Sequence, residues 1–400
     1  MKQLDEKYRI KRNVTFNIYE VIIITLALTI LICGCFVFFY GKNSKAFTSK
    51  SGFNDIEKTY DDIMKNYYES VDEQALADAA VNGMLDYLDE KYSKYLNNTS
   101  SEILENSLSG EYQGIGVTVS QKDSDIVVVS VVDNSPAQKA GLKANDIITS
   151  INGDKIGGKI NLNYMVDLIK KSKSVRLGIL RDGSEKEYKI DVKAIEVDVV
   201  FSKLLESDNK KIGYIFIESF STNTYKQFKS RLKELENENI DSLIIDVRDN
   251  LGGYVSVCTD ILDLFMEKDS ILYSLEEKNE YKNILDKTNE NRTYPVVILV
   301  NEASASASEI LTSSFKENYG AIIVGKKTYG KGKVQTTSKL KDNSMVKYTS
   351  ARWLSPTGNI IDGIGIIPDI SVDLDEEYYL NPGDDTDNQL HKAIEILEKQ

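Results

Sequence analysis

The chain has 400 residues, of which 41% are hydrophobic and 28% are charged, and its formal net charge is −13. This length allows two or three domains with real cores, and the balanced composition excludes an intrinsically disordered chain. The acidic charge argues against nucleic acid as a partner, because binding to phosphate backbones depends on Lys and Arg that displace counterions.

The amino-terminal residues differ in kind from the rest of the chain. Residues 1–17 form a basic tail, and residues 18–40 are nearly all apolar, long enough to cross a hydrocarbon core of ~30 Å as one helix. Basic residues are denser before this run than after it, so the positive-inside rule predicts a cytoplasmic amino terminus. We therefore expect a single-pass protein of the cell membrane, with everything after Tyr40 outside the cytoplasm.

A cleaved signal peptide is the alternative for this segment. The apolar run is longer than the usual stretch of about 7–15 residues, and no Ala-x-Ala cleavage site follows it, which favours an uncleaved anchor. Cys33 and Cys35 lie in the predicted span and Cys258 is alone in the exported part, so no intrachain disulfide framework is expected there. The exported fold must be stabilised by packing.

The segment after the predicted span is helical in pattern. Residues 41–54 read as a polar linker, and residues 55–109 as a helical region in which apolar side chains recur at helical spacing. We expect two helices between Asp55 and Tyr95, used for packing or dimerisation. No residue in them looks catalytic.

Residues 110–195 have the pattern of a β-rich module. Ile126–Val132 and Ile147–Ile151 read as strands, the second closed by an Asn-Gly turn, and residues 162–170 are amphipathic. The motif Ser135-Pro-Ala…Gly141-Leu…Asn145-Asp-Ile-Ile…Ile151-Asn-Gly153 resembles the signature of a PDZ domain. The run Gly114-Ile115-Gly116-Val117 looks like the carboxylate-binding loop of such a domain, because unshielded backbone N–H groups can form a nest for a terminal carboxylate. The simpler alternative is that the two glycines only permit a tight strand entry.

From residue 196 to residue 385 strands alternate with helices, and residues 386–400 read as a closing helix. This alternation predicts an α/β domain with a largely parallel sheet, whose ligand sites lie at the carboxyl ends of the strands. The charged residues 276–291 look like an excursion on the surface. The overall fold class is therefore α/β multidomain: membrane helix, helical segment, PDZ module and α/β core.

Two loops of the α/β part carry residues suited to nucleophilic catalysis. Ser306 lies in Asn301-Glu-Ala-Ser-Ala-Ser-Ala-Ser-Glu309, and Lys331 lies in Thr328-Tyr-Gly-Lys-Gly-Lys-Val-Gln335. The only histidine is His391, in a charged tail near the chain end, so a serine nucleophile here would need lysine as its base. At helical spacing Ser304 and Ser308 project together, whereas Ser306 faces nearly the other way. A serine at a helix amino terminus also has unpaired N–H groups beside it, and that of Ala307 is the natural donor to an oxyanion.

Each of these residues has a plainer interpretation. Ser306-Ala-Ser-Glu309 fits a capping box, and Lys331 could be a solvated loop lysine. A lysine base must be substantially neutral, so its surroundings must be dry. Gln335 could orient the amine through its amide oxygen without restoring the proton, as a carboxylate there would.

A third glycine-containing turn follows the strand Leu243–Val247. Gly252 and Gly253 can expose backbone N–H groups to the carbonyl oxygen of a bound peptide, although an ordinary strand-to-helix turn explains them equally well. The residue pattern indicates no cofactor and no metal site.

Taken together, these motifs resemble the C-terminal processing peptidases, a family of Ser/Lys endopeptidases with a PDZ domain and a crotonase- or Clp-like core. The resemblance rests on the serine motif, the Thr328–Gln335 motif, Asp246-Val-Arg…Gly252-Gly253 and the PDZ signature, in the family's order. It implies Ser306 as nucleophile, Lys331 as general base, Gln335 as its orienting partner, and Gly252, Gly253 and Ala307 as the oxyanion hole. It also implies that the PDZ domain captures a carboxyl terminus and gates the site. Leu251 stands where the family usually has proline, and Tyr329 where phenylalanine is commoner.

The resulting hypothesis is a membrane-anchored serine endopeptidase that acts on carboxyl-terminal regions of exported proteins. Its partners would be proteins or peptides with free carboxyl termini and the membrane, and the family resemblance suggests a homodimer built from terminal helices. The alternative is a catalytically inactive PDZ scaffold that binds peptides at the membrane. A third hypothesis, a related fold that hydrolyses small ligands, leaves the PDZ module without a role.

Overall fold

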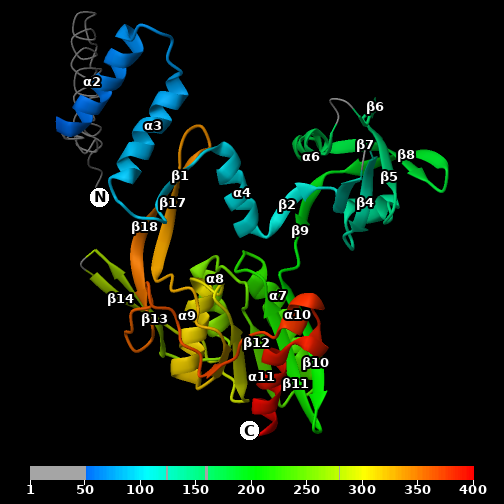
Figure 1. Ribbon diagram of the computed structural model, residues 1–400, viewed down its shortest axis with the longest axis vertical. Helices are drawn as coiled ribbons and strands as arrows, with labels where there is room; N and C mark the ends of the chain where they lie inside the picture. The colour runs from blue at the N-terminus through cyan, green and yellow to red at the C-terminus, as the bar shows by residue number, and fades with distance from the viewer. Residues whose placement is uncertain (1–50, 123–124, 158–160, 279) are drawn as a thin grey trace, which may run out of the picture. The chain divides into compact units, whose positions relative to one another are not determined.

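The computed structural model describes residues 51–400 except residues 123–124, 158–160 and 279, and Figure 1 shows its course. The chain divides after Val81 into two compact units, residues 1–81 and 82–400. The predicted span at residues 18–40 lies outside the described residues. Among the described residues, no helix combines the length and the apolar character needed to cross a membrane.

The two helices expected after the linker are present. They are α2 (Ser51–Asn66) and α3 (Glu73–Asp86), followed by a short strand β1 (Lys94–Leu96) and a further helix α4 (Asn98–Ser109). The Asn97 side chain accepts the N–H of Ser100 to cap α4, and Gly110 ends it in the left-handed conformation. The strand β1 was not predicted, because three residues are too few to show a periodic pattern.

The PDZ module forms one antiparallel sheet with two helices. Its strands run in the order β3-β4-β5-β7-β8, with β6 paired to β5, and the predicted strands and amphipathic helix are confirmed. The elements are β3 (Val117–Lys122), β4 (Asp125–Val131), α5 (Pro136–Ala140), β5 (Ile147–Ile151), β6 (Asp154–Lys155), α6 (Leu162–Lys171), β7 (Ser174–Arg181) and β8 (Ser184–Asp191). Asn152 and Gly153 both have positive φ, 53° and 93°, as a tight hairpin turn requires. Two further strands, β2 (Glu111–Gly114) and β9 (Lys193–Glu196), pair with each other where the module begins and ends.

The α/β core is built on a sheet with strand order β10-β11-β12-β15-β16-β19. Within this sheet the five strands β11, β12, β15, β16 and β19 are parallel, as predicted, and β10 is antiparallel to β11. Their bounds are β10 (Val200–Ser207), β11 (Lys210–Ile217), β12 (Ser242–Asp246), β15 (Val296–Val300), β16 (Ile322–Gly325) and β19 (Ile370–Ser371). Strands β12 and β15 are buried along their whole length, which explains why they read as continuous apolar runs.

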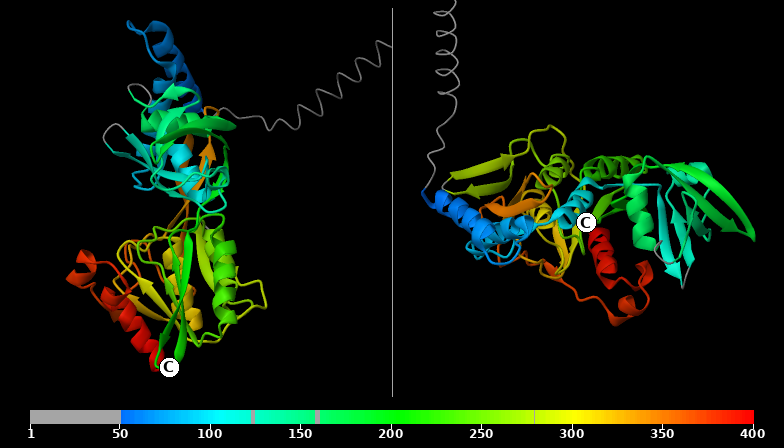
Figure 2. Two further views of the ribbon diagram at one scale, coloured as in Figure 1. Left: turned by 90° about the vertical axis from the view of Figure 1, so that its right-hand side faces the viewer. Right: turned by 90° about the horizontal axis from the view of Figure 1, so that it is seen from above.

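Helices cover both faces of this sheet (Figures 1 and 2). On one face, α7 (Thr224–Asn237), α8 (Val255–Leu262) and α9 (Ala307–Ser314) pack with alternate strand residues into one apolar cluster. On the other face, α11 (Asn388–Glu398) packs through Leu390, Ala393 and Leu397 against the remaining strand residues. The apolar side of the closing helix is therefore buried within its own chain. The short elements η1 (Phe315–Tyr319), α10 (Glu376–Leu380) and η2 (Asp384–Thr386) complete the core.

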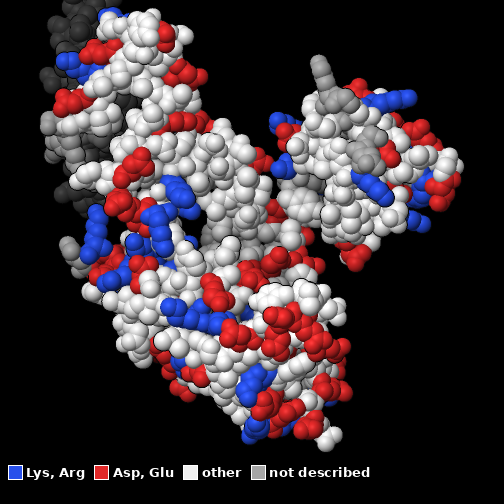
Figure 3. Space-filling model, viewed as in Figure 1, with Lys and Arg blue, Asp and Glu red and all other residues white. Residues whose placement is uncertain are grey.

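A second, antiparallel sheet was not predicted. It consists of β13 (Ile271–Glu277), β14 (Glu280–Leu285), β17 (Lys333–Lys339) and β18 (Met345–Leu354), and β1 pairs with β18 at its edge. The charged excursion predicted at residues 276–291 is thus largely a hairpin arm, with the residues of β14 mostly exposed. Figure 3 shows Lys and Arg side chains over the region of β17 and β18, while Asp and Glu gather over the lower part of the α/β core.

Candidate active site

Three loops meet at the carboxyl ends of three neighbouring parallel strands. They follow β12, β15 and β16, whose registers place Asp246 beside Leu299 and Val300 beside Gly325. The N–H of Ala305 donates to the carbonyl oxygen of Asn250 at 3.0 Å, and the N–H of Tyr329 donates to that of Ser304 at 3.1 Å. The sheet therefore joins the three motifs that are far apart in the sequence.

Ser306 has an unusual backbone conformation. It precedes α9 with φ 58° and ψ −114°, a strained region for a residue with a side chain, and it is 8% exposed. Such strain costs on the order of 1–3 kcal/mol and is held in place only by firm surroundings. Gly252 supplies part of these surroundings, because a Cβ on it would lie 2.8 Å from the Cβ of Ser306 and 3.1 Å from the nitrogen of Ala307.

The neighbouring serines have structural partners. Ser304 Oγ donates to the carbonyl oxygen of Val247 at 2.8 Å, and Ser308 Oγ donates to that of Asn250 at 2.9 Å. Both hydroxyls thus bind the loop after β12, in agreement with the prediction that these two serines share one side. The three serines of the motif are not equivalent, and Ser304 and Ser308 are already engaged.

Glu309 connects the serine loop to the lysine loop. Its side chain is completely buried, and Oε2 accepts the N–H of Ser306 at 2.9 Å and the N–H of Lys331 at 2.8 Å. Oε1 accepts the hydroxyl of Thr328 at 2.5 Å and the N–H of Gly330 at 2.7 Å. The capping-box interpretation accounts for only the bond to Ser306. The sequence showed Glu309 as a cap but held no sign that its carboxylate also reaches a loop some twenty residues away.

Lys331 is held by its backbone on both sides. Besides the bond of its N–H to Glu309, its carbonyl oxygen accepts the indole N–H of Trp353 at 2.9 Å. The pKa of Lys331 lies below the ordinary lysine value because burial disfavours the ammonium, and the charge of Lys347 lowers it further. The charges of Glu309 and Glu90 oppose this shift. The direction is the one that a lysine base requires.

The glycines around Lys331 allow two loops to touch. A Cβ on Gly330 would lie 2.9 Å from the nitrogen of Gly365, and a Cβ on Gly332 would lie 2.4 Å from the nitrogen of Asp362. Any side chain at either position would push these backbones apart. The sequence interpretation that the glycines permit close approach agrees with these distances.

Gln335 lies near Lys331 in the chain but bonds elsewhere. Its Nε2 donates to the carbonyl oxygen of Lys333 at 3.1 Å and to Thr349 Oγ1 at 3.5 Å. The hydrogen bonds of the described residues include none between Gln335 and Lys331. The role of Gln335 as orienting partner stays a prediction.

The glycine pair after β12 is arranged as a turn with unequal N–H groups. The N–H of Gly252 donates to Asn250 Oδ1 at 2.8 Å. Within the described part of the chain, no hydrogen bond is donated by the N–H of Gly253 or of Ala307. These two N–H groups are the ones available to an oxyanion, and Gly252 instead supplies close packing against Ser306.

Asn250, which the sequence interpretation did not single out, organises this turn. It is fully buried, its Nδ2 donates to the carbonyl oxygen of Ile217 at 2.8 Å, and its own carbonyl oxygen accepts from Ala305 and Ser308. An amide suits this place because it can donate and accept within a few ångströms. Only the folded arrangement reveals that all these partners surround it.

The predicted carboxylate loop of the PDZ module is tightly built. A Cβ on Gly116, where φ is 84°, would lie 2.2 Å from the Cβ of Ser135, so only glycine fits. The carbonyl oxygen of Ile115 accepts the N–H of Ala137 at 2.8 Å. The following strand β3, which begins at Val117, stands at one end of the sheet order, and no strand of the described residues pairs with its outer edge, as addition of a peptide strand requires. Gly114, the first residue of the predicted loop, ends β2.

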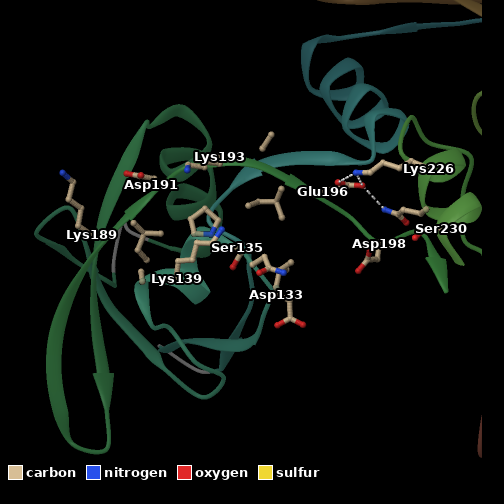
Figure 4. Close-up of a pocket in the computed structure, with 18 of the residues that line it drawn as sticks. Asp133, Ser135, Lys139, Lys189, Asp191, Lys193, Glu196, Asp198, Lys226 and Ser230 are labelled. Carbon is tan, nitrogen blue, oxygen red and sulfur yellow. Dashed lines mark hydrogen bonds and ion pairs between the residues drawn. The ribbon is translucent and has the colours of Figure 1, made fainter. Parts of the chain in front are cut away.

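A pocket of about 1140 Å³ lies elsewhere, beside α5 and β9 (Figure 4). Ser135, Lys139, Lys193, Glu196 and Lys226 are among its lining residues, and Glu196 forms an ion pair with Lys226 at 3.3 Å. Its lining contains neither the candidate catalytic residues nor the predicted carboxylate loop. It is not the site built from the three loops.

Comparison with known proteins agrees with these features. Residues 211–372 match the model of peptidase family S41, residues 113–192 that of the PDZ domain, and residues 40–100 that of the activating protease CtpB N-terminal domain. The chain is 38% identical over 332 residues to the carboxy-terminal processing protease CtpB of Bacillus subtilis, covering 82% of this chain and 69% of that protein. It is 34% identical over 356 residues to CtpA of the same organism, covering 88% of this chain and 75% of the relative.

Among solved structures, a candidate S41 protease from Bacteroides fragilis aligns with a TM-score of 0.51 at 15% identity. The alignment covers 85% of this chain and 97% of that structure, and at this identity it shows the fold alone. The S41 match over the α/β core and the PDZ match over the β-rich module define a serine peptidase that carries a PDZ domain. The chain belongs to the carboxy-terminal processing proteases of peptidase family S41.

Proposed function

We propose that this protein is a membrane-anchored serine endopeptidase in which Ser306 is the nucleophile and Lys331 the general base. The observation that carries the proposal is the buried carboxylate of Glu309, which binds the N–H groups of both residues. One rigid acceptor between the two loops is what a nucleophile and base need in order to keep a fixed mutual position. The lowered pKa of Lys331, caused first by burial, supports the same assignment.

The proposed reaction follows from the chemistry of the groups. Ser306 Oγ attacks the scissile carbonyl carbon while its proton passes to Lys331 Nζ. The oxyanion is stabilised by the N–H groups of Gly253 and Ala307. The ammonium of Lys331 then gives its proton to the leaving amine, the C–N bond breaks, and an acyl-enzyme remains. Water then attacks this ester while Lys331 Nζ takes its proton. The C–O bond to Ser306 breaks, Lys331 returns the proton to Ser306 Oγ, and the remaining peptide leaves with a new carboxyl terminus.

The substrates that we propose are unstructured carboxyl-terminal regions of exported proteins. The support is the glycine loop at residues 114–117, which lies beside the outer edge of β3. This arrangement suits an extended peptide that ends in a free carboxylate. Capture of the peptide by the PDZ module would gate the catalytic site. The apolar run at residues 18–40 supports a single-pass anchor with a cytoplasmic amino terminus and the catalytic region outside.

A homodimer through terminal helices is also part of the proposal. The closing helix α11 buries its apolar side in its own core, so it offers little surface for such a contact. Helices α2 and α3 keep Phe53, Ile56, Met64 and Met84 exposed, which supports them as the contact between copies.

The test is the cleavage of an unstructured protein with an apolar carboxyl terminus, followed by mass spectrometry. Wild type should produce fragments, whereas Ser306→Ala and Lys331→Ala should each lose more than about a hundredfold in kcat/KM. Equal turnover by the three proteins would refute the assignment. Tight peptide binding by the wild type without any product would instead favour the scaffold alternative.

A further inference from the structure

The segment between α3 and β1 lies against the lysine site, although the sequence predicted only a packing role for this region. Ser93 Oγ accepts the N–H of Thr349 in β18 at 3.1 Å, and Glu90 Oε2 accepts the hydroxyl of Thr349 at 2.7 Å. The next residues, Lys94–Leu96, then pair with β18 as strand β1. Residues 90–96 are therefore bonded directly to the sheet that follows Lys331.

Tyr92 is the residue of this segment that meets the lysine. Lys331 Nζ lies 5.3 Å from the centroid of the Tyr92 ring, within the distance at which an ammonium is attracted by an aromatic face. The hydroxyl of Tyr92 is buried and forms no well-aligned hydrogen bond among the described residues, although Lys91 and Tyr329 lie close enough to act on it: burial raises the pKa of Tyr92, Lys91 lowers it and Tyr329 raises it. The contact of Tyr92 with Lys331 is therefore made by the ring and not by the hydroxyl.

Glu90 fixes the backbone of the segment that carries Tyr92. Its Oε1 accepts the N–H of Tyr92 at 3.2 Å, and its Oε2 accepts the hydroxyl of Ser93 at 2.9 Å. Burial alone would raise the pKa of Glu90, but the hydrogen bonds from Thr349 and Ser93 hold it below the usual value. Glu90 thus stays a carboxylate, and its ion pair with Lys333 at 3.4 Å adds a further tie to β17.

We propose that Tyr92 is a positioning residue for Lys331, whose ring excludes water from the amine and offers its π face to the ammonium that forms during catalysis. This inference rests on the proposed role of Lys331 as the base. The neutral amine of Lys331 requires neighbouring groups that exclude water. The same groups must stabilise the ammonium that forms when Lys331 takes up the proton of Ser306. An aromatic ring meets both needs, whereas an aliphatic side chain meets only the first.

The charged and titratable groups around the amine come from every element packed against it. Glu309 in α9 and Glu90 carry negative charge, and Lys347 in β18 carries positive charge. Two further ammonium groups face the same ring, Lys91 at 4.6 Å and Lys333 at 6.0 Å from its centroid. The ring therefore lies among several lysines, and its effect on Lys331 must be measured at that residue alone.

The test measures Lys331 directly, without using turnover. In the Ser306→Ala background, trace labelling of amines with acetic anhydride at a series of pH values, followed by peptide mass spectrometry, gives the pH midpoint at which Lys331 becomes reactive. Tyr92→Leu keeps the site dry but removes the π face, so the midpoint should move down by about 0.5 to 1. Tyr92→Ala admits water, so the midpoint should move up by about 1 or more. The conservative Tyr92→Phe, which keeps the ring, should restore the midpoint of the parent.

Tyr95→Leu removes a neighbouring tyrosine from the same segment and is the matched control, with no expected change in the midpoint. The proposal would be overturned if the pH midpoints of Tyr92→Leu and Tyr92→Ala moved in the same direction. It would also be overturned if the midpoint of Tyr92→Phe matched that of Tyr92→Leu. In enzyme with Ser306 intact, Tyr92→Leu should lower kcat several-fold and leave KM unchanged. If the wild type cleaves nothing while the labelling shifts appear as expected, the proposed peptidase function fails and the placement of Tyr92 stands.

Discussion

Replacing Glu309 by glutamine should separate the serine loop from the lysine loop while leaving the side-chain shape almost unchanged. The carboxylate accepts four hydrogen bonds at 2.5 to 2.9 Å, two on each oxygen. An amide keeps one acceptor oxygen and presents an NH₂ group to the other two donors. Two buried donors are then left without a partner in a site from which water is excluded.

The expected size of the effect follows from those two bonds. Hydrogen bonds to charged groups contribute about 1.5–3 kcal/mol each, so Glu309→Gln should lower the free energy of unfolding by roughly 3–6 kcal/mol. For a domain of about 150–250 residues the Tm should fall by roughly 6–24 °C. Because a displacement of about 1 Å at a catalytic group can cost about a hundredfold in rate, kcat/KM should fall at least that far at temperatures where the variant is folded.

The charge of Glu309 gives a second readout. It raises the pKa of Lys331, so its removal should lower that pKa further. A base is active in its deprotonated form, so the residual activity of the variant should reach its half-maximum at a lower pH than that of the wild type. The assays are thermal unfolding by circular dichroism and kcat/KM for an unstructured substrate measured across pH.

Glu317 provides a control within the same chain, partly buried and with three of its bonds on Oε2 and one on Oε1, so its glutamine variant should lose less stability than Glu309→Gln. Its carboxylate also accepts four hydrogen bonds, from Ser355, from both the N–H and the hydroxyl of Thr357, and from Asn359, at 2.8 to 3.2 Å. Glu317→Gln should destabilise the fold without changing the pH profile of the reaction. If Glu309→Gln kept its stability and its kcat/KM within about twofold of wild type, or matched Glu317→Gln in both assays, the connecting role of Glu309 would be refuted.

Three further predictions concern charge, space and buried ion pairs. Lys347→Met removes a positive charge that lowers the pKa of Lys331, so the half-maximum of kcat/KM should move to higher pH; an unmoved profile would show that the two amines are not coupled. Gly252→Ala should abolish cleavage, because the added Cβ would overlap atoms of the serine loop. Gly358→Ala, at a similarly positive φ but with open space around it, should stay active. Equal activity of the two variants would contradict the packing argument. Arg248→Met leaves two buried carboxylates, of Asp246 and Asp387, without their cation, so urea unfolding should show a loss of about 3–5 kcal/mol, and a loss under 1 kcal/mol would count against a structural role for this network.

Much of the α/β core was predictable because its strands are apolar along their whole length and its helices have one apolar face. The strand predicted at Leu243–Val247 and the closing helix predicted at residues 386–400 agree with the observed β12 and α11 within one or two residues. The apolar pattern of helix α8 would carry it to Met266, but the helix ends at Leu262, and Leu264, Phe265 and Met266 pack into the core from the loop that follows. Boundaries of this kind depend on tertiary contacts that periodicity does not record.

The antiparallel sheet was missed for a different reason. Strand β14 is mostly exposed and β17 is polar along its outer half, so neither has the alternation that marks a half-buried strand. Strand β14 forms because it pairs with β13 across a turn, and β17 forms because it pairs with β18. Strand β1 is too short to be recognised without its partner β18.

The amino-acid sequence by itself determined the family and the presence of a PDZ module, and it singled out Ser306 and Lys331 as candidates, because these inferences depend on local motifs and on the scarcity of histidine. Only the tertiary structure decided what surrounds that pair. Glu309, Asn250 and Tyr92 meet partners far away in the chain, through hydrogen bonds and a ring contact that exist only after the sheet has brought the loops together. A motif specifies which chemical groups are available, whereas packing decides which of them are dry, held and close enough to react.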